Sequence, residues 1–352
     1  MPITRSAFSA TARGLKAFLN LEAGIVRADV PSPPESRQTE RGKQGELERL
    51  RALLATKERQ IATLCAAKNG VGVRPENLIW IFGTGRSGNT WLSSMMGDLQ
   101  GHDTWREPGV GMLFGGFYFV SSLERQRKTN NFILGEGYRE IWLGSIRNFV
   151  LDGARSRFPD LGEDGYLTVK EQVGSVGAPL MMEALPESRM VLLVRDPRDV
   201  VASVLDASRE GAWHYERRKN DPDWTSKTNE DPNAMTEERA TRYLMQVGAG
   251  KDAYDAHGGP KVLIKYEDLR NDTLGTMKRL YSTLGVPVDE EELARAVHKH
   301  SWENIPEEKR GEGKFYRKAT PGGWREDLTL EQAAAVEKIT APLLQEFYPV
   351  KS

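Results

Sequence analysis

The sequence predicts an α/β protein, a three-layer sandwich in which helices cover both faces of a central parallel sheet. Two observations lead to this prediction. From residue 77 onward, short apolar runs alternate with amphipathic helical patterns, and a Gly-rich turn follows the first run. Repeated strand–turn–helix units form parallel sheets, because each crossover helix returns the chain to the same end of the sheet.

Three strand–helix units carry this pattern. Residues 78–82 (LIWIF), 190–194 (MVLLV) and 261–266 (KVLIKY) predict strands. The stretch after each strand has apolar residues at helical spacing, as in Leu92, Met95, Met96 and Leu99 after the first, Val200, Val201, Val204 and Leu205 after the second, and Leu274, Met277, Leu280 and Leu284 after the third. Ligands of such sheets bind beyond the carboxyl ends of the strands, where we expect the functional site.

The first 75 residues differ from the rest, so we predict an N-terminal extension (1–75) before one domain (76–352). Its prolines, Pro31, Pro33 and Pro34, indicate a linker. Residues 40–68 predict an amphipathic helix, with apolar positions at Leu47, Leu50, Leu54, Ile61 and Leu64. We favour docking of this helix on its own domain. A homodimer contact through residues 40–68 is the alternative.

Composition excludes several classes of protein. The 49 Lys and Arg residues against 50 Asp and Glu give a net charge of −1, unlike a protein that coats nucleic acid. With Cys65 as the single cysteine, the chain has no internal disulfide and no cysteine-built metal site. No signal peptide and no long apolar stretch is seen, so we expect a cytoplasmic protein without a transmembrane segment.

Two segments interrupt the strand–helix alternation. Residues 109–150 are rich in Gly and aromatic residues, and residues 209–240 are polar with Trp213, Tyr215 and Trp224. Each is interpreted either as a lid over the site or as a surface loop.

The run from Gly83 to Trp91 (GTGRSGNTW) predicts a P-loop-like phosphate-binding loop. It follows a strand and opens a helix, so its backbone N–H groups and the helix dipole favour an anion. Asn89 stands where an NTPase has its lysine, and the cation is instead Arg86. A metal-free loop of this kind suits a sulfuryl group better than a triphosphate.

A second anion site is predicted after the strand at 190–194. Arg195 ends that strand, and Ser203 follows eight residues later, early in the next helix. Both side chains can therefore reach one anion, and the guanidinium fork is well suited to phosphate.

The run from Arg86 to Trp91 (RSGNTW) resembles the 5′-phosphosulfate loop of the sulfotransferase superfamily, in its bacterial and Golgi-type form. These enzymes use 3′-phosphoadenosine-5′-phosphosulfate (PAPS) and release adenosine 3′,5′-bisphosphate (PAP). The resemblance implies that the phosphosulfate is held by Arg86, Ser87, Gly88, Asn89 and Thr90, and that Trp91 stacks on the adenine.

Three further elements are similar to that family, and the resemblance spans about residues 77–330. The run from Arg195 to Ser203 resembles its 3′-phosphate motif. Arg317-Lys318 resembles the Arg-Lys-Gly pair that contacts the same phosphate, although Ala319 replaces the Gly and Gly323 a later Asp. In the YEDL run, Tyr266 is implied to lie near the adenine.

The catalytic residues are expected on the acceptor side. Cytosolic members use a His in a Lys-x-His run, but the corresponding run here is Lys170-Glu171-Gln172. Golgi-type members use a Glu beyond the phosphate loop, and Glu107 lies 21 residues after Arg86. We therefore expect Glu107 as general base, with Glu171 as runner-up, and Lys170 and Arg86 as the cations that stabilise developing charge. A surface lysine is the alternative for Lys170.

The resemblance implies transfer of a sulfuryl group from PAPS to an acceptor hydroxyl, without a metal, and the Golgi-like Glu107 favours a carbohydrate-type acceptor. A nucleotide or small-molecule kinase and a non-catalytic nucleotide-binding protein are the alternatives. The five histidines match no motif and are interpreted as structural or exposed: His102, His214, His257, His298 and His300.

Overall fold

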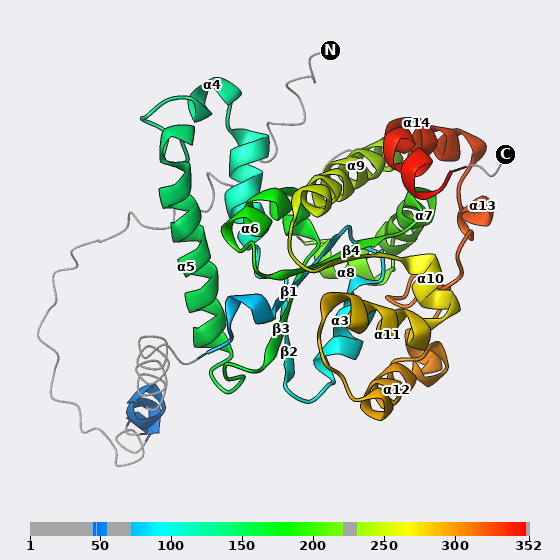
Figure 1. The fold of residues 1–352 in the computed structure, drawn as a ribbon. Coiled ribbons are helices and arrows are strands. Elements are labelled where there is room, and N and C mark those ends of the chain that lie inside the picture. The colour runs from blue at the N-terminus through cyan, green and yellow to red at the C-terminus, as the bar shows by residue number, and fades with distance from the viewer. Residues whose placement is uncertain (1–44, 47, 55–71, 221–230, 350–352) are drawn as a thin grey trace, which may run out of the picture.

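The computed structural model describes residues 45–46, 48–54, 72–220 and 231–349 of the chain. Its centre is a sheet of five parallel strands in the order β2-β3-β1-β4-β5. The strands are β1 (Leu78–Gly83), β2 (His102–Arg106), β3 (Tyr166–Glu171), β4 (Arg189–Val194) and β5 (Lys261–Lys265). The predicted α/β sandwich with a central parallel sheet is confirmed (Figure 1).

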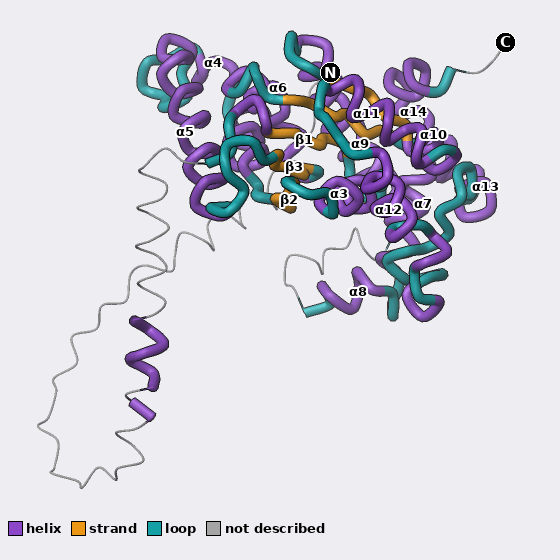
Figure 2. Tube along the Cα trace, turned by 60° about the horizontal axis from the view of Figure 1, so that its bottom comes forward, coloured by secondary structure: helices purple, strands orange, loops and turns teal. Residues whose placement is uncertain are grey.

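Helices cover both faces of this sheet. Figure 2 shows the strands in orange with helices around them. The main helices are α3 (Asn89–Gly97), α5 (Arg139–Arg157), α6 (Ala178–Ala184), α7 (Pro197–Ser208), α8 (Trp213–Arg218), α9 (Pro232–Ala256), α11 (Thr273–Leu284), α12 (Glu290–Lys299) and α14 (Leu330–Phe347); α4 (Glu124–Arg127), α10 (Tyr266–Asn271) and α13 (Trp324–Asp327) are shorter. Within the described ranges, every helix falls short of the length and apolar character that a membrane span requires.

The central strand β1 explains the two layers, because successive side chains of a strand point to opposite faces. Trp80 and Phe82 belong to the core shared with α5, α6, α9 and α14. Ile81 belongs to the core on the other face, with α3, α11 and α12. All six residues of β1 are buried, which explains why this strand reads as a continuous apolar run.

The strand register positions the site. Phe82 of β1 is paired with Glu171 of β3, and Gly83 with Leu193 of β4. The loops that leave these three strands therefore begin side by side at one edge of the sheet, as expected for a ligand site in a parallel sheet.

The segment 109–150 does not form a lid. It contains a π-helix (Met112–Ser121), α4 and α5. Its residues Tyr118 and Trp142 are buried in the core beside α6 and α9, so packing accounts for part of the aromatic composition of this segment. Other aromatic residues of the segment are exposed: Phe117, Phe119, Tyr138 and Phe149.

The predicted linker prolines and most of the predicted N-terminal helix lie outside the described residues. Residues 45–46 and 48–54 are helical, as the pattern predicts. Leu50 and Leu54 are exposed, with 56% and 59% of their surface accessible. The preferred interpretation, in which these leucines dock on the domain, is therefore wrong for this part of the helix.

Candidate active site

The loops after β1, β3, β4 and β5 line one cavity with a volume of about 610 Å³. This volume is within the range of small-molecule and nucleotide sites. The predicted site residues that line it are Arg86, Gly88, Asn89, Thr90, Trp91, Glu107, Lys170, Arg195, Ser203, Tyr266, Arg317 and Lys318. Ser87, the remaining predicted residue, is fully buried in the loop beneath.

The loop after β1 is closed by contacts that only certain residues permit. Gly88, the N-cap of α3, has φ +91°, and a Cβ there would lie 2.8 Å from the Tyr266 ring. The side-chain amide of Asn89 donates a hydrogen bond to the Thr84 carbonyl at 2.8 Å. Asn89 therefore closes the loop from the position where an NTPase places its lysine.

Arg86 connects this loop to two other segments. It has φ +69°, in the left-handed region that few non-glycine residues adopt. Its Nε donates to Ser203 Oγ at 2.9 Å, and its Nη2 donates to the Phe315 carbonyl at 2.8 Å. Burial, and then the positive charges of Arg195 and Arg317, lower the pKa of Arg86 to about 10. Arg86 is thus a charged group in a crowded cationic site at neutral pH.

Arg195 lies beside Arg86. Its Nη1 donates to the Arg86 carbonyl at 2.9 Å, and its guanidinium stacks 4.3 Å from the centre of the Tyr266 ring. Since Arg86 also contacts Ser203, the structure brings the two predicted anion sites together around one guanidinium.

Glu107 and Lys170 form an ion pair at another part of the cavity wall, with 2.8 Å between Lys170 Nζ and Glu107 Oε1. Lys170 Nζ is also 3.4 Å from Thr90 Oγ1, so the pair adjoins the first turn of α3. Only 4% of Lys170 is accessible, and the alternative of a surface lysine is wrong. Glu107 has φ +50°, a strained conformation of the kind that concentrates at functional sites.

Glu171, the runner-up base, is fully buried and is not among the described residues that line the cavity. The backbone N–H of Gly111 donates to its Oε1 at 3.5 Å. Burial, and then the negative charge of Glu107, raise the pKa of Glu171 to about 7. Its side chain therefore lies behind the wall that Glu107 and Lys170 form.

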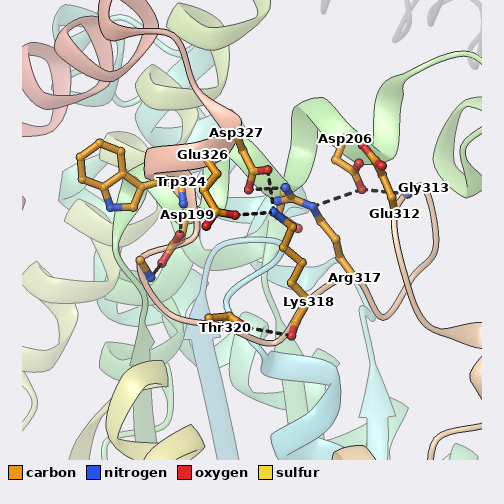
Figure 3. A network of polar contacts seen from close by, with 12 residues as sticks. Asp199, Asp206, Glu312, Gly313, Arg317, Lys318, Thr320, Trp324, Glu326 and Asp327 are labelled. Atoms are coloured by element: carbon orange, nitrogen blue, oxygen red, sulfur yellow. Dashed lines mark hydrogen bonds and ion pairs between the residues drawn. The ribbon is translucent and has the colours of Figure 1, made fainter.

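Arg317 and Lys318 are held by carboxylates, as Figure 3 shows. Arg317 forms an ion pair with Asp327 and lies 3.5 Å from Asp206 of α7. Lys318 Nζ is 2.9 Å from Asp327 and 3.3 Å from Glu326. Both cations thus line the cavity while sharing one carboxylate.

Asp199 ties this C-terminal segment to α7. Its carboxylate accepts hydrogen bonds from the backbone N–H groups of Gly322 at 2.7 Å and Trp324 at 2.9 Å (Figure 3). Its neighbour Arg198 pairs with Asp196 and Glu337 instead. The two residues therefore do not pair with each other at the helix start.

Ala319 occupies the position at which the family has Gly, and it has φ +52°. We expect Ala319→Gly to stabilise the protein by up to about 1 kcal/mol, because the left-handed conformation costs a residue with a Cβ about 1–2 kcal/mol and glycine's extra chain entropy offsets part of the gain. Urea unfolding measures the change. The matched control, Ala334→Gly on the exposed face of α14, should lose about 1 kcal/mol. Equal losses in both variants would contradict the strain at Ala319.

Several cavity residues have no counterpart among the predicted ones. Trp302 lines the cavity near Trp91, whose indole N–H donates to the His300 carbonyl at 2.8 Å. His214 and His300 also line the cavity. His300 Nε2 lies 2.6 Å from Asp98 Oδ2, which agrees with the interpretation of this residue as structural. The only sequence signal for Trp302 is that it is an isolated tryptophan preceding Arg317-Lys318 in the chain.

The cavity is strongly cationic although the chain is nearly neutral. Its lining contains ten Arg and Lys residues and three carboxylates, Glu107, Asp199 and Asp327. In the described part of the chain, Ser87 Oγ, Asn89 Oδ1 and Arg195 Nε are buried without a hydrogen-bond partner. Buried polar atoms are normally paired, which makes these three atoms candidate contacts for a polar ligand. The described residues contain no group of three or more His, Cys, Asp and Glu side chains placed to hold a metal.

Comparison with solved structures finds sulfotransferases at low sequence identity. Mouse sulfotransferase SULT7A1 complexed with PAP has a TM-score of 0.48 at 15% identity, over 77% of this chain and 85% of that one. Sulfotransferase STF9 from Mycobacterium avium has a TM-score of 0.49 at 14% identity, over 78% of each chain.

Sequence comparison points to the same family. Sulfotransferase 2A6 of Rattus norvegicus is 27% identical over 100 residues, which are 25% of this chain and 35% of the rat protein. The chain therefore matches about a third of the length of this curated relative. Residues 178–348, from α6 to the end of α14, match the sulfotransferase domain family. These residues make up about half of the chain, and over them the chain is similar to sulfotransferases.

Proposed function

We propose that this protein transfers the sulfuryl group of PAPS to a hydroxyl of a carbohydrate-type acceptor, with residues 76–352 as the catalytic domain. One observation carries the proposal: a single cavity contains the Arg86, Arg195 and Ser203 cluster and, at another part of its wall, the Glu107–Lys170 pair. An anion site and a carboxylate–ammonium pair in one cavity are what sulfuryl transfer to a hydroxyl requires.

The residues present fit PAPS. Its three anionic groups match the cationic lining, and the unpartnered Ser87 Oγ and Arg195 Nε offer buried polar atoms. Arg86, Ser87, Gly88, Asn89 and Thr90 are assigned to the phosphosulfate, Arg195, Ser203, Arg317 and Lys318 to the 3′-phosphate, and Trp91 and Tyr266 to the adenine. When bound, PAPS supplies the activated sulfuryl group.

Glu107 is the proposed general base that accepts the proton of the acceptor hydroxyl. Lys170, 2.8 Å from Glu107, orients that carboxylate and adds positive charge near the reacting atoms. Arg86 adds a second positive charge from the phosphate loop. Both cations are already in place in a buried site, so charge that develops on the leaving phosphate is stabilised without reorganisation.

The first test is transfer of labelled sulfate from PAPS in the presence of EDTA. Because Arg86 and Lys170 supply the positive charge in this proposal, we expect full activity without a divalent metal. Each acceptor is assayed with EDTA and again with added Mg²⁺. Strict dependence on Mg²⁺ would instead support a kinase-like mechanism.

The 3′-phosphate assignment predicts that Arg195→Ala weakens PAP binding. A lost charged hydrogen bond costs roughly 1.5–3 kcal/mol, about 10- to 150-fold in affinity. Binding of 5′-AMP, which lacks the 3′-phosphate, should change little. Calorimetry with both nucleotides measures the difference, and wild-type protein that binds PAP and 5′-AMP equally well would rule the assignment out.

A further inference from the structure

A second cationic surface lines the same cavity and has no role in the proposed transfer. It consists of four arginines, Arg217 and Arg218 in the last turn of α8 and Arg239 and Arg242 on α9. Arg239 and Arg242 are three residues apart, so they lie on one face of α9. We call these four residues the α8–α9 wall.

The α8–α9 wall is continuous with the phosphate loop through Trp213. The guanidinium of Arg86 lies 5.6 Å from the Trp213 ring, and that of Arg217 lies 5.7 Å from the same ring. The backbone N–H of Trp213 donates to the Gly313 carbonyl at 2.9 Å, and its ring packs edge-on against Phe315 at 5.1 Å. This contact fixes α8 against the segment that precedes Arg317.

Positive charge is concentrated at this wall. The three carboxylates that line the cavity, Glu107, Asp199 and Asp327, all come from other elements. Among the described residues outside the cavity lining, Glu238 forms ion pairs with both Arg239 and Arg242 and offsets part of their charge. The positive charge also affects His214, which is on the same helix as Arg217. Burial, and then the charges of Arg239, Arg217, Arg218 and Arg86, lower the pKa of His214 to about 4.

We propose that the α8–α9 wall binds an oxyanion of the acceptor, so that the preferred acceptor is a hydroxyl compound that carries a carboxylate or a sulfate. The inference rests on the proposed sulfuryl transfer. Guanidinium groups bind both oxyanions through paired hydrogen bonds, and a helix-borne cluster of them next to Arg86 places such a group inside the reaction cavity.

The nucleotide does not account for this wall. Its phosphate positions are assigned to groups around the loop, α7 and the Arg317–Lys318 pair. An acidic acceptor makes charged hydrogen bonds with guanidinium groups of the wall, which its neutral analogue cannot make, and this difference gives specificity.

The test compares matched acceptors. The probes are 4-hydroxybenzoate against 4-hydroxybenzyl alcohol, and hyaluronan tetrasaccharide against chitotetraose, each assayed with PAPS. We expect the acidic member of a pair to have a kcat/KM at least about tenfold higher, the effect of one charged hydrogen bond. The variant Arg217→Gln/Arg242→Gln should abolish this preference and leave PAP affinity unchanged. The control Arg125→Gln/Arg295→Gln makes the same charge change at exposed positions on α4 and α12 and should keep the preference.

Each outcome decides the matter. Equal or better turnover of the neutral members, or sulfation of no acidic member by protein that binds PAP, overturns the inference. Loss of PAP binding in Arg217→Gln/Arg242→Gln, with normal binding in the control variant, assigns the wall to the nucleotide and also overturns it. Wild-type protein that fails to bind PAP contradicts the proposed function instead.

Discussion

Glu107→Gln is expected to lower the turnover rate by roughly 10²–10⁴-fold, the usual contribution of a positioned general base, and to leave PAP binding nearly unchanged. Of the three carboxylates that line the cavity, Asp199 accepts two backbone hydrogen bonds and Asp327 pairs with two cations. Glu107 pairs with Lys170 at 2.8 Å and accepts a long hydrogen bond from the Val173 N–H at 3.5 Å. Gln preserves the shape of the side chain and removes its capacity to accept a proton. Steady-state assays and calorimetry with PAP measure the two effects.

Glu171→Gln is the matched control. Glu171 lies behind the cavity wall, so turnover should stay near that of the wild type. Its raised pKa of about 7, against an ordinary value of 4.5, means that the folded state binds the proton more tightly. Its contribution to stability therefore falls as pH rises from about 4.5 to about 7, and Gln removes this dependence.

The opposite result would relocate the base. If Glu107→Gln keeps near-normal turnover and Glu171→Gln is inactive, then the proton acceptor belongs to the Lys170-Glu171-Gln172 run. The similarity to Golgi-type enzymes would then be wrong on the acceptor side, while the PAPS site could stand.

The predictability of the fold follows from where each strand lies. Strands β1 and β4 are buried on both faces and therefore read as apolar runs. The edge strand β2, with the sequence HDTWR, is only partly buried and mixes polar with apolar residues. No apolar run marks it, so the sequence alone does not reveal it.

The candidate site, like the fold, could be predicted only in part from the sequence. Arg86, Arg195 and Ser203 could be located because each lies at a fixed distance from a strand end. Their mutual contact could not, since the left-handed backbone of Arg86 turns its side chain towards α7. The α8–α9 wall is likewise set by a tertiary contact: Trp213 binds Gly313, one hundred residues away in the chain.

Lys170→Met is expected to lower the turnover rate by roughly 10²–10³-fold, the loss typical of one preorganised group that stabilises transition-state charge. Lys170 is buried, pairs with Glu107 and adjoins Thr90 at the start of α3, so its charge acts on the reacting atoms through little solvent. Met keeps the aliphatic stem and removes the charge. Lys170→Arg is expected to recover only part of the rate, because a planar guanidinium does not reproduce a compact ammonium.

Lys261→Met is the control variant that separates an effect of Lys170→Met on folding from an effect on catalysis. Lys261 is also a strand lysine, and its Nζ donates to the carbonyls of Tyr254 and His257 at 2.6 and 2.7 Å, outside the cavity. Its replacement should lower the free energy of unfolding and leave the turnover rate of the folded protein intact. Lys170→Met should instead lose most of its turnover rate while the folded protein still binds PAP. If both variants lose rate only in proportion to their unfolded fraction, Lys170 supports the fold and Arg86 is the remaining candidate for stabilising the leaving phosphate.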